Sequence, residues 1–347
     1  MTTQKQTTKQ ASSKTTQQPE VLNVKLAYDP GNRGLKLWDG NKFTHLVAVF
    51  NKQIGVRAPR VIKDHSVHFH VTKEPTNKFA NQTFMVGPQA ASYGTVQRVY
   101  EGYKLDNPGL FLMALVAKQY PKATKINAQV VVNLTEGDLP EYAEQMIGNL
   151  KGNYEFTVGD QSVSLKVSKV LVVEEGLGAW SLYNATNPQP EKFYRGVINL
   201  GGATLDGILV DSDGLVLEDS AFRSQDGGTT DLANRIRNEI VNGAQADPSA
   251  SGIPLDNFMA GIEDGSFVYN GAGLSFKEEY DLLFPDWFNS SIAQVQRAWR
   301  RQFSKIQTII VTGGSANLIA YRVQGNSKFY LTPNPVRDNC IGILNYL

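Results

Sequence analysis

Residues 197–210 read Val-Ile-Asn-Leu-Gly-Gly-Ala-Thr-Leu-Asp-Gly-Ile-Leu-Val, two apolar runs on either side of a Gly-Gly turn. Each run has the composition of a short buried strand, so the pattern predicts a β-hairpin with its polar atoms at the tip. Glycine lets the backbone approach a ligand closely and aim its N–H groups at an anion. The candidate phosphate-binding residues are Gly201, Gly202, Ala203 and Thr204. An ordinary tight hairpin fits the same letters, because short glycine motifs often arise by chance.

Two oxygen-bearing side chains flank this turn, Asn199 before it and Asp206 after it. Amide and carboxylate oxygens are groups that a hydrated Mg²⁺ accepts. Both residues are therefore candidates for a metal site beside bound phosphates.

A similar pattern lies near the N-terminus, where residues 24–40 read Val-Lys-Leu-Ala-Tyr-Asp-Pro-Gly-Asn-Arg-Gly-Leu-Lys-Leu-Trp-Asp-Gly. Asp29, Gly31 and Lys36 have the same mutual spacing as the corresponding positions of the later hairpin. Two such hairpins suggest two related half-molecules, each offering a phosphate-binding turn to one shared ligand. Pro30 lacks an N–H group and cannot donate. The candidate donors of this turn are Gly31, Asn32 and Arg33.

The pair of hairpins resembles the two phosphate loops of the actin superfamily of ATPases. The ParM-type plasmid-segregating actins are most similar: their second loop reads Asp-Leu-Gly-Gly-Thr-Thr-Leu-Asp, and residues 199–206 read Asn-Leu-Gly-Gly-Ala-Thr-Leu-Asp. The resemblance covers residues 22–347. It implies an actin-like ATPase fold, with two related RNase H-like α/β domains flanking a nucleotide cleft. It also implies that Asp29 and Asp206 position a hydrated Mg²⁺ and that Lys36 contacts phosphate, although Lys36 also fits an exposed strand lysine.

The resemblance also divides the chain into domains. Residues 1–20 are mostly Thr, Gln, Lys and Ser, a composition that predicts a disordered tail. The first domain is expected over residues 21–197 and is completed by residues 331–347. The second domain is expected over residues 198–330.

A strand followed by small residues, Leu-Val-Val-Glu-Glu-Gly-Leu-Gly-Ala-Trp at 171–180, resembles the first helix connecting the halves of an actin. ParM-type proteins carry Pro-Glu-Ser-Ile-Pro-Ala there, which aligns Glu175 with their catalytic glutamate. A carboxylate at the mouth of a phosphate cleft can orient the attacking water. Alternatively, Glu174 and Glu175 only cap a helix N-terminus, where negative charge is favourable.

Two further segments have counterparts in the family. Residues 309–319 read Ile-Ile-Val-Thr-Gly-Gly-Ser-Ala-Asn-Leu-Ile and resemble its adenosine motif, and residues 335–344 resemble its second connecting helix. A helix predicted over residues 232–240 would lie beside the base, although its polar side chains also fit a solvated face. The candidate nucleoside contacts are Gly313, Gly314, Ser315, Ala316, Arg235 and Asn238.

Composition restricts the function classes. The chain has 347 residues, 41% of them hydrophobic, and a net charge of +1, so charge gives no argument for direct nucleic-acid binding. The single cysteine excludes an intrachain disulfide and fits a reducing cytoplasm. No apolar run has the length of a membrane span. A basic amphipathic helix is predicted over residues 290–305 and interpreted as a solvated surface.

The expected activity is hydrolysis of ATP or GTP with Mg²⁺, coupled to growth of a cytoplasmic filament. Plasmid segregation is the implied task, and the expected partners are other copies of the chain and a DNA-binding adaptor protein. Asn199 departs from the aspartate of the family and removes a charge, which leaves a slow or non-hydrolysing filament scaffold as an alternative. A small-molecule kinase of the same superfamily is a second alternative.

Overall fold

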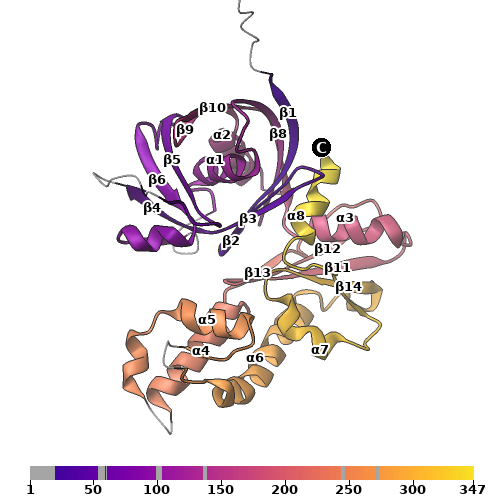
Figure 1. The fold of residues 1–347 in the computed structure, drawn as a ribbon. Helices are drawn as coiled ribbons and strands as arrows, with labels where there is room; N and C mark the ends of the chain where they lie inside the picture. Colours follow the sequence, from indigo (N-terminus) through magenta and orange to yellow (C-terminus); the bar gives the residue numbers. More distant parts are fainter. Residues whose placement is uncertain are drawn as a thin grey trace, which may run out of the picture.

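The computed structural model describes residues 20–53, 59, 61–98, 104–135, 139–243, 247–269 and 273–347. The tail expected over residues 1–20 lies outside the described residues except for its last position. Two lobes, each built on a β-sheet, meet beside the helices α3 (Leu177–Thr186) and α8 (Asp338–Ile343) (Figure 1). In the described ranges, no helix is long and apolar enough to cross a membrane.

The N-terminal lobe contains a ten-stranded sheet in the order β3-β2-β1-β8-β10-β9-β5-β6-β4-β7. The apolar run at 128–134 lies in β8, and residues 154–173 lie in the antiparallel strand pair of β9 and β10. The strands are β1 (Leu22–Pro30), β2 (Gly34–Trp38), β3 (Phe43–Val47), β4 (Val49–Gln53), β5 (Val67–Lys73), β6 (Gln82–Val86), β7 (Gln97–Arg98), β8 (Lys125–Leu134), β9 (Gly152–Val158) and β10 (Gln161–Glu174).

The second lobe contains a five-stranded sheet in the order β13-β12-β11-β14-β15. Its strand β11 begins at Tyr194, ahead of the expected domain division at residue 197, so the exact division stays a proposal. The strands are β11 (Tyr194–Leu200), β12 (Leu205–Val210), β13 (Phe222–Ser224), β14 (Ile306–Thr312) and β15 (Phe329–Leu331).

The two sheets repeat one arrangement of strands. The set β3-β2-β1-β8-β10 and the set β13-β12-β11-β14-β15 have the same order and the same succession of antiparallel and parallel pairs. Asp29 lies opposite Lys36 in the β1–β2 hairpin. Asn199 lies opposite Asp206 in the β11–β12 hairpin. Two related α/β halves, predicted from the repeated spacing, are therefore present.

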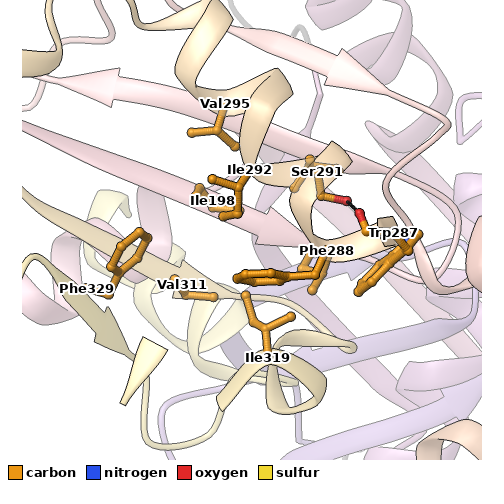
Figure 2. A pocket seen from close by; sticks show the side chains of 11 residues that line it. Ile198, Trp287, Phe288, Ser291, Ile292, Val295, Val311, Ile319 and Phe329 are labelled. Carbon is orange, nitrogen blue, oxygen red and sulfur yellow. Dashed lines mark hydrogen bonds between the residues drawn. The ribbon is translucent and has the colours of Figure 1, made fainter. Parts of the chain in front are cut away.

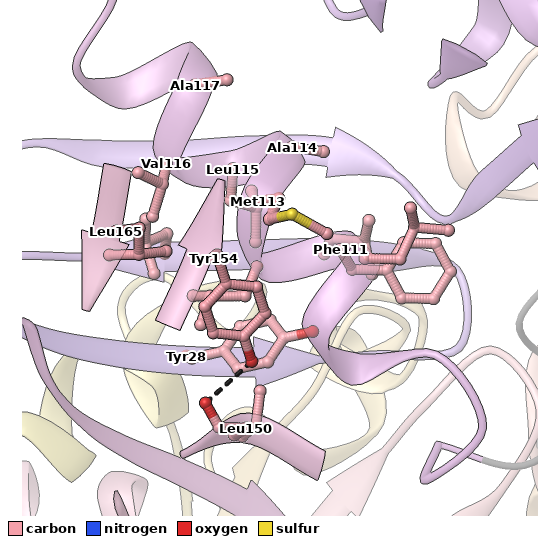
Figure 3. Close-up of a cluster of buried hydrophobic side chains, with 14 of the residues drawn as sticks. Tyr28, Phe111, Met113, Ala114, Leu115, Val116, Ala117, Leu150, Tyr154 and Leu165 are labelled. Atoms are coloured by element: carbon pink, nitrogen blue, oxygen red, sulfur yellow. Dashed lines mark hydrogen bonds between the residues drawn. The ribbon is translucent and has the colours of Figure 1, made fainter. Parts of the chain in front are cut away.

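Helix α1 (Pro108–Gln119) is buried on all sides, as its continuous apolar run predicts. Its side chains Phe111 and Met113 lie in the core near Tyr154, whose hydroxyl donates to the Leu150 carbonyl at 2.7 Å (Figure 3). Leu150 ends α2 (Pro140–Leu150). The sequence over 136–150 has the pattern of an amphipathic helix. Helix α2 lies within this range, and residues 136–138 lie outside the described part of the chain.

The α-helices described in the second lobe are α4 (Thr229–Asn242), α5 (Leu255–Glu263), α6 (Lys277–Ala298) and α7 (Ala320–Val323). Trp287, Phe288 and Val295 of α6 lie over the second sheet near Ile198 and Val311 (Figure 2).

The helix predicted over residues 290–305 is wrong at both ends, because α6 runs from Lys277 to Ala298 and contains Pro285. Its buried positions Phe284, Trp287 and Val295 recur at helical spacing on both sides of that proline, so burial outweighs the helix-breaking tendency of proline. Arg300 and Arg301 follow the helix.

Helices α3 and α8 cross at two glycines. A Cβ on Gly178 would lie 1.9 Å from the Asn339 carbonyl oxygen, and one on Gly342 would lie 2.0 Å from the Gly178 carbonyl oxygen. The backbones therefore touch, and only glycine fits either position. The Cys340 Sγ on α8 contacts the Ala27 carbonyl of β1 at 3.6 Å, which attaches the crossing to the first sheet.

Candidate functional site

The tips of the two predicted phosphate hairpins are in contact. A Cβ on Gly202 would lie 2.3 Å from the Cδ atom of Arg33, so the Arg33 side chain covers the second turn. The Arg33 carbonyl accepts a hydrogen bond from the Ala48 N–H at 3.0 Å, which fixes the first turn to the start of β4. The structure thus brings together two turns that lie far apart in the sequence.

The predicted adenosine turn packs against the second hairpin. The Ser315 N–H donates to the Leu200 carbonyl at 3.0 Å, and its Oγ donates to the Gly201 carbonyl at 3.2 Å. Gly313 has φ 103°, and a Cβ there would lie 2.4 Å from the Leu200 carbonyl oxygen, so this close approach requires glycine. Ala316 is buried beside this turn. A Cβ on Gly314 would meet no atom within 4 Å, so this residue leaves open space.

Helix α4 begins at the second hairpin. The N–H groups of Thr229 and Thr230 donate to the carbonyls of Gly201 and Gly202 at 3.3 and 2.7 Å. The N-terminal end of the helix dipole is positive, so α4 adds a favourable field for an anion at this turn.

The two α4 residues predicted beside the base have other environments. Arg235 forms an ion pair with Asp231 at 3.0 Å, and Asn238 is exposed. A role for either residue in base binding stays a prediction.

The first hairpin holds a buried ion pair. Lys36 Nζ lies 2.6 Å from Asp29 Oδ2, and both side chains are largely buried. Burial opposes the charge on Lys36, but the Asp29 carboxylate outweighs it and raises the lysine pKa. Lys36 is therefore a permanent cation held beside the first turn, as a phosphate contact requires.

Glu175 is buried between the two halves, directly after β10, and its carboxylate has three donors. Its Oε2 atom accepts from Lys104 Nζ and, at 2.7 Å, from the Thr135 hydroxyl. Its Oε1 atom accepts from Asn199 Nδ2 at 2.7 Å. Helix α3 starts after Gly176 with no side-chain capping bond, so the contacts of Glu175 are not those of a helix cap.

The neighbours of Glu175 decide its ionisation. Burial alone would raise its pKa, but the Lys104 ammonium and the hydrogen bonds from Lys104 and Thr135 lower that pKa to about 2. Burial would likewise lower the Lys104 pKa, and the Glu175 carboxylate raises it instead. Glu175 is thus a carboxylate at any physiological pH and a hydrogen-bond acceptor rather than a strong base.

Asp206 is a second buried carboxylate, with an unusual environment. Its Oδ2 atom accepts from the Thr204 hydroxyl at 2.7 Å, while Oδ1 has no hydrogen-bond partner and lies 3.8 Å from Arg223 Nε. Burial, and next the negative charge of Glu175, raise its pKa to about 7. A cavity of about 80 Å³ opens here, lined by Asp206, Arg223, Thr135, Glu174 and Glu175 among others.

These carboxylates fit a hydrated magnesium ion better than a directly bound one. Among the described residues, no group of three or more His, Cys, Asp or Glu side chains could hold a metal ion by itself. Mg²⁺ usually keeps several waters and takes one or two carboxylates together with substrate phosphates. The unpartnered Oδ1 of Asp206 is a suitable acceptor for such a water.

Asp29 is linked to the crossing helices through two asparagines. With the Asn133 amide nitrogen turned toward Asp29, it lies 3.3 Å from Asp29 Oδ1, and its oxygen accepts from Asn339 Nδ2 at 2.9 Å. Asn339 Oδ1 in turn accepts from the Ala179 N–H at 3.3 Å. A change at Asp29 can therefore reach the crossing of α3 and α8.

Among the described residues, two ion pairs join α5 of the second lobe to the first lobe. Arg33 pairs with Glu263, and Arg98 Nε lies 2.9 Å from Asp256 Oδ2. Asp256 and Glu263 are seven positions apart on α5, so they lie on one face of that helix.

Sequence reasoning missed several of these residues. Lys104 and Arg223 belong to no motif, and only the folded chain brings them to the carboxylates. Thr135 could have been identified from the sequence, because it is a polar residue that directly follows the last residue of the mostly apolar strand β8.

A family of known proteins matches part of the sequence. Residues 197–325 match the model of the archaeal actin homologue MreB-like, C-terminal, family. A comparison with the curated proteins finds no significant match.

Solved structures match along nearly the whole chain. The archaeal actin homologue Ta0583 shares 15% identity at a TM-score of 0.75, covering 93% of this chain and 98% of its own; it has also been solved in complex with ADP. A 15-stranded ParM filament from Clostridium botulinum gives 15% identity and a TM-score of 0.72, covering 94% of this chain and 99% of its own. Bacillus thuringiensis ParM with ATP gives 14% identity and a TM-score of 0.63, covering 93% and 97%.

The partial sequence match and the shared architecture confirm the resemblance deduced from the hairpins. The structure contains two sheets of the same strand topology. Their hairpin turns are in contact, and helices α3 and α8 cross between the lobes at two glycines. The chain therefore has the actin-like fold of the archaeal actin homologue and the ParM structures, and its residues 197–325 match an archaeal actin homologue family.

Proposed function

We propose that this protein is a cytoskeletal ATPase or GTPase that assembles into filaments and hydrolyses its nucleotide with Mg²⁺. The observation that carries the proposal is the convergence of both hairpin turns and the Glu175 carboxylate at one cleft. The nucleotides present in structures of similar fold, ADP in the archaeal homologue and ATP in a ParM, support the ligand class.

The proposed roles follow from charge and position. The β-hairpin turns and Lys36 hold the phosphates, and the turn at Gly313 holds the nucleoside. Asp29 and Asp206 accept hydrogen bonds from the water shell of the metal. Mg²⁺, when bound, neutralises charge that develops on the phosphates during transfer.

Glu175 is proposed to orient the water that attacks the γ-phosphorus. In phosphoryl transfer the protein supplies mostly positioning and electrostatic stabilisation, so a fixed acceptor of low basicity is suited to this task. The pKa of Glu175 is lowered to about 2, so it stays ionised and able to accept a hydrogen bond from that water.

Filament growth is the proposed use of the nucleotide. A similar fold occurs in the Clostridium botulinum ParM filament, which supports other copies of this chain as the binding partner. Plasmid segregation through a DNA-binding adaptor protein, in the cytoplasm, is the proposed biological task. It rests on the resemblance to ParM-type proteins.

Light scattering and phosphate release, measured together, test the proposal. With ATP or GTP and Mg²⁺, scattering should rise and then decay as phosphate is released, while ADP should give little assembly. Assembly without phosphate release would favour the non-hydrolysing scaffold. Phosphate transfer to an added sugar or acetate without assembly would favour a kinase.

A further inference from the structure

Asn199 turns its amide nitrogen, rather than its oxygen, toward the proposed catalytic carboxylate. Nδ2 lies 2.7 Å from Glu175 Oε1. A carboxylate can only accept, so the group that faces it must be a donor. The Asn199 oxygen points away, toward Gly313, where a Cβ would lie 2.5 Å from it. The side chain is thus held between Glu175 and the third glycine turn.

The two oxygens of Glu175 are not equivalent. Each carboxylate oxygen has two lone pairs. Oε2 uses both, for Lys104 and Thr135, whereas Oε1 has one donor among the described residues, Asn199. The remaining acceptor position is therefore on Oε1, next to the Asn199 amide.

We propose that Asn199 is a positioning residue for Glu175 rather than a metal ligand, and that Glu175 accepts the attacking water at Oε1. This inference rests on the proposed function, because it assigns parts within the same hydrolysis reaction. It revises the metal role that the sequence suggested for Asn199.

Charge explains why an amide suits this position. Asn199 lies opposite Asp206 in the hairpin register and in contact with Glu175. An aspartate there would add a further buried carboxylate beside Glu175 and Asp206 and would replace a donor by an acceptor. Like charges at this distance repel strongly in a buried site. The asparagine instead donates a hydrogen bond to Glu175 without adding charge.

Two substitutions separate positioning from metal binding. Asn199→Ala removes the donor and adds no charge, and Asn199→Asp replaces the donor by an anion. Three quantities are measured for each: kcat and KM for phosphate release, and the Mg²⁺ concentration that gives half-maximal binding of a fluorescent ATP analogue. Asn345→Ala is the control, since it removes an exposed amide that donates to Ser181 at 2.9 Å on the surface.

A positioning role predicts that kcat falls on the order of 10- to 10²-fold in Asn199→Ala, because small misplacements of a catalytic group cost that much. The Mg²⁺ requirement and KM should stay near wild type, and Asn199→Asp should not restore kcat. A metal-ligand role predicts the reverse: Asn199→Ala raises the Mg²⁺ requirement and Asn199→Asp lowers it.

The outcomes also separate this inference from the proposed function. Normal wild-type turnover with an unchanged kcat in Asn199→Ala would overturn the positioning role alone. A wild-type protein that binds the analogue with Mg²⁺ but releases no phosphate would overturn both the proposed hydrolysis and the role of Oε1.

Discussion

Arg98 on β7 and Asp256 on α5 form an ion pair, 2.9 Å between Nε and Oδ2, that joins the two lobes across the cleft. One face of α5 holds the first lobe at two points, because Glu263 pairs with Arg33 at the tip of the first hairpin. A nucleotide bound at the proposed site would therefore enter and leave past contacts that connect the two lobes.

Neutralising these two carboxylates should speed nucleotide release. The pairs are partly exposed, so each contributes about 0.5 kcal/mol, and Asp256→Asn with Glu263→Gln should raise the dissociation rate about 2- to 5-fold at low salt. High salt should remove the difference, since it screens partly exposed charges. Stopped-flow release of a fluorescent nucleotide measures this. Asp264→Asn is the control, since that carboxylate accepts from the Ser266 N–H at 2.8 Å within its own turn.

The binding of Mg²⁺ should weaken as pH falls through 7. Burial and the neighbouring Glu175 raise the Asp206 pKa to about 7, and only the ionised form of Asp206 favours a cation. Protons therefore compete below that pH, and the Mg²⁺ concentration for half-maximal nucleotide binding should rise up to about tenfold per pH unit. Asp206→Asn should lose this pH dependence. A flat profile in the wild type would contradict the role of Asp206 at the metal.

Replacing Glu175 should slow hydrolysis and prolong filaments. Glu175→Gln keeps the size of the side chain but removes its charge, and phosphate release should fall on the order of 10²-fold or more. Nucleotide affinity should change little, because Lys36 and the turns hold the phosphates. Filament lifetime, followed by light scattering after a nucleotide pulse, should increase.

The control for this experiment follows from burial. Glu174 is buried and lines the same cavity as Glu175, so a substitution of this neighbouring glutamate is unsuitable as a neutral control. Glu155 is exposed on β9, and Glu155→Gln should behave as wild type. Equal phosphate release by the two variants would remove Glu175 from the mechanism.

Adding a methyl group at the helix crossing should destabilise the fold. Gly178→Ala places a Cβ 1.9 Å from the Asn339 carbonyl oxygen, so the two helices must separate, at a cost of about 1–3 kcal/mol. Gly148→Ala on α2 is the matched control, since its Cβ would meet no atom within 4 Å. That change should stabilise the protein by about 0.5–1 kcal/mol, because alanine favours a helix over glycine. Denaturant unfolding should give a lower free energy of unfolding than wild type for Gly178→Ala and a higher one for Gly148→Ala.

Local pattern was sufficient to predict the hairpins, the third glycine turn and the helix α1. Asp29 and Lys36 lie opposite each other in the hairpin, at the spacing that a turn between two paired strands requires. The helix predicted over 290–305 includes only the C-terminal part of α6, because burial of Trp287 keeps the helix continuous across Pro285. Lys104 could not be predicted, since its contact with Glu175 joins residues that are 71 positions apart and depends on the packing of both halves.

The shared register of the two hairpins has a consequence for the direction in which a ligand would bind. An exact internal duplication would present the same residues on both sides of the cleft, and a ligand could then bind in either of two opposite directions. Here the first hairpin pairs an aspartate with a lysine, and the second pairs an asparagine with an aspartate. The first pair is neutral and offers a cation, and the second carries net negative charge and offers acceptors. These four side chains break the pseudo-symmetry, and at the proposed site they would favour one direction for a phosphate chain and its counterion.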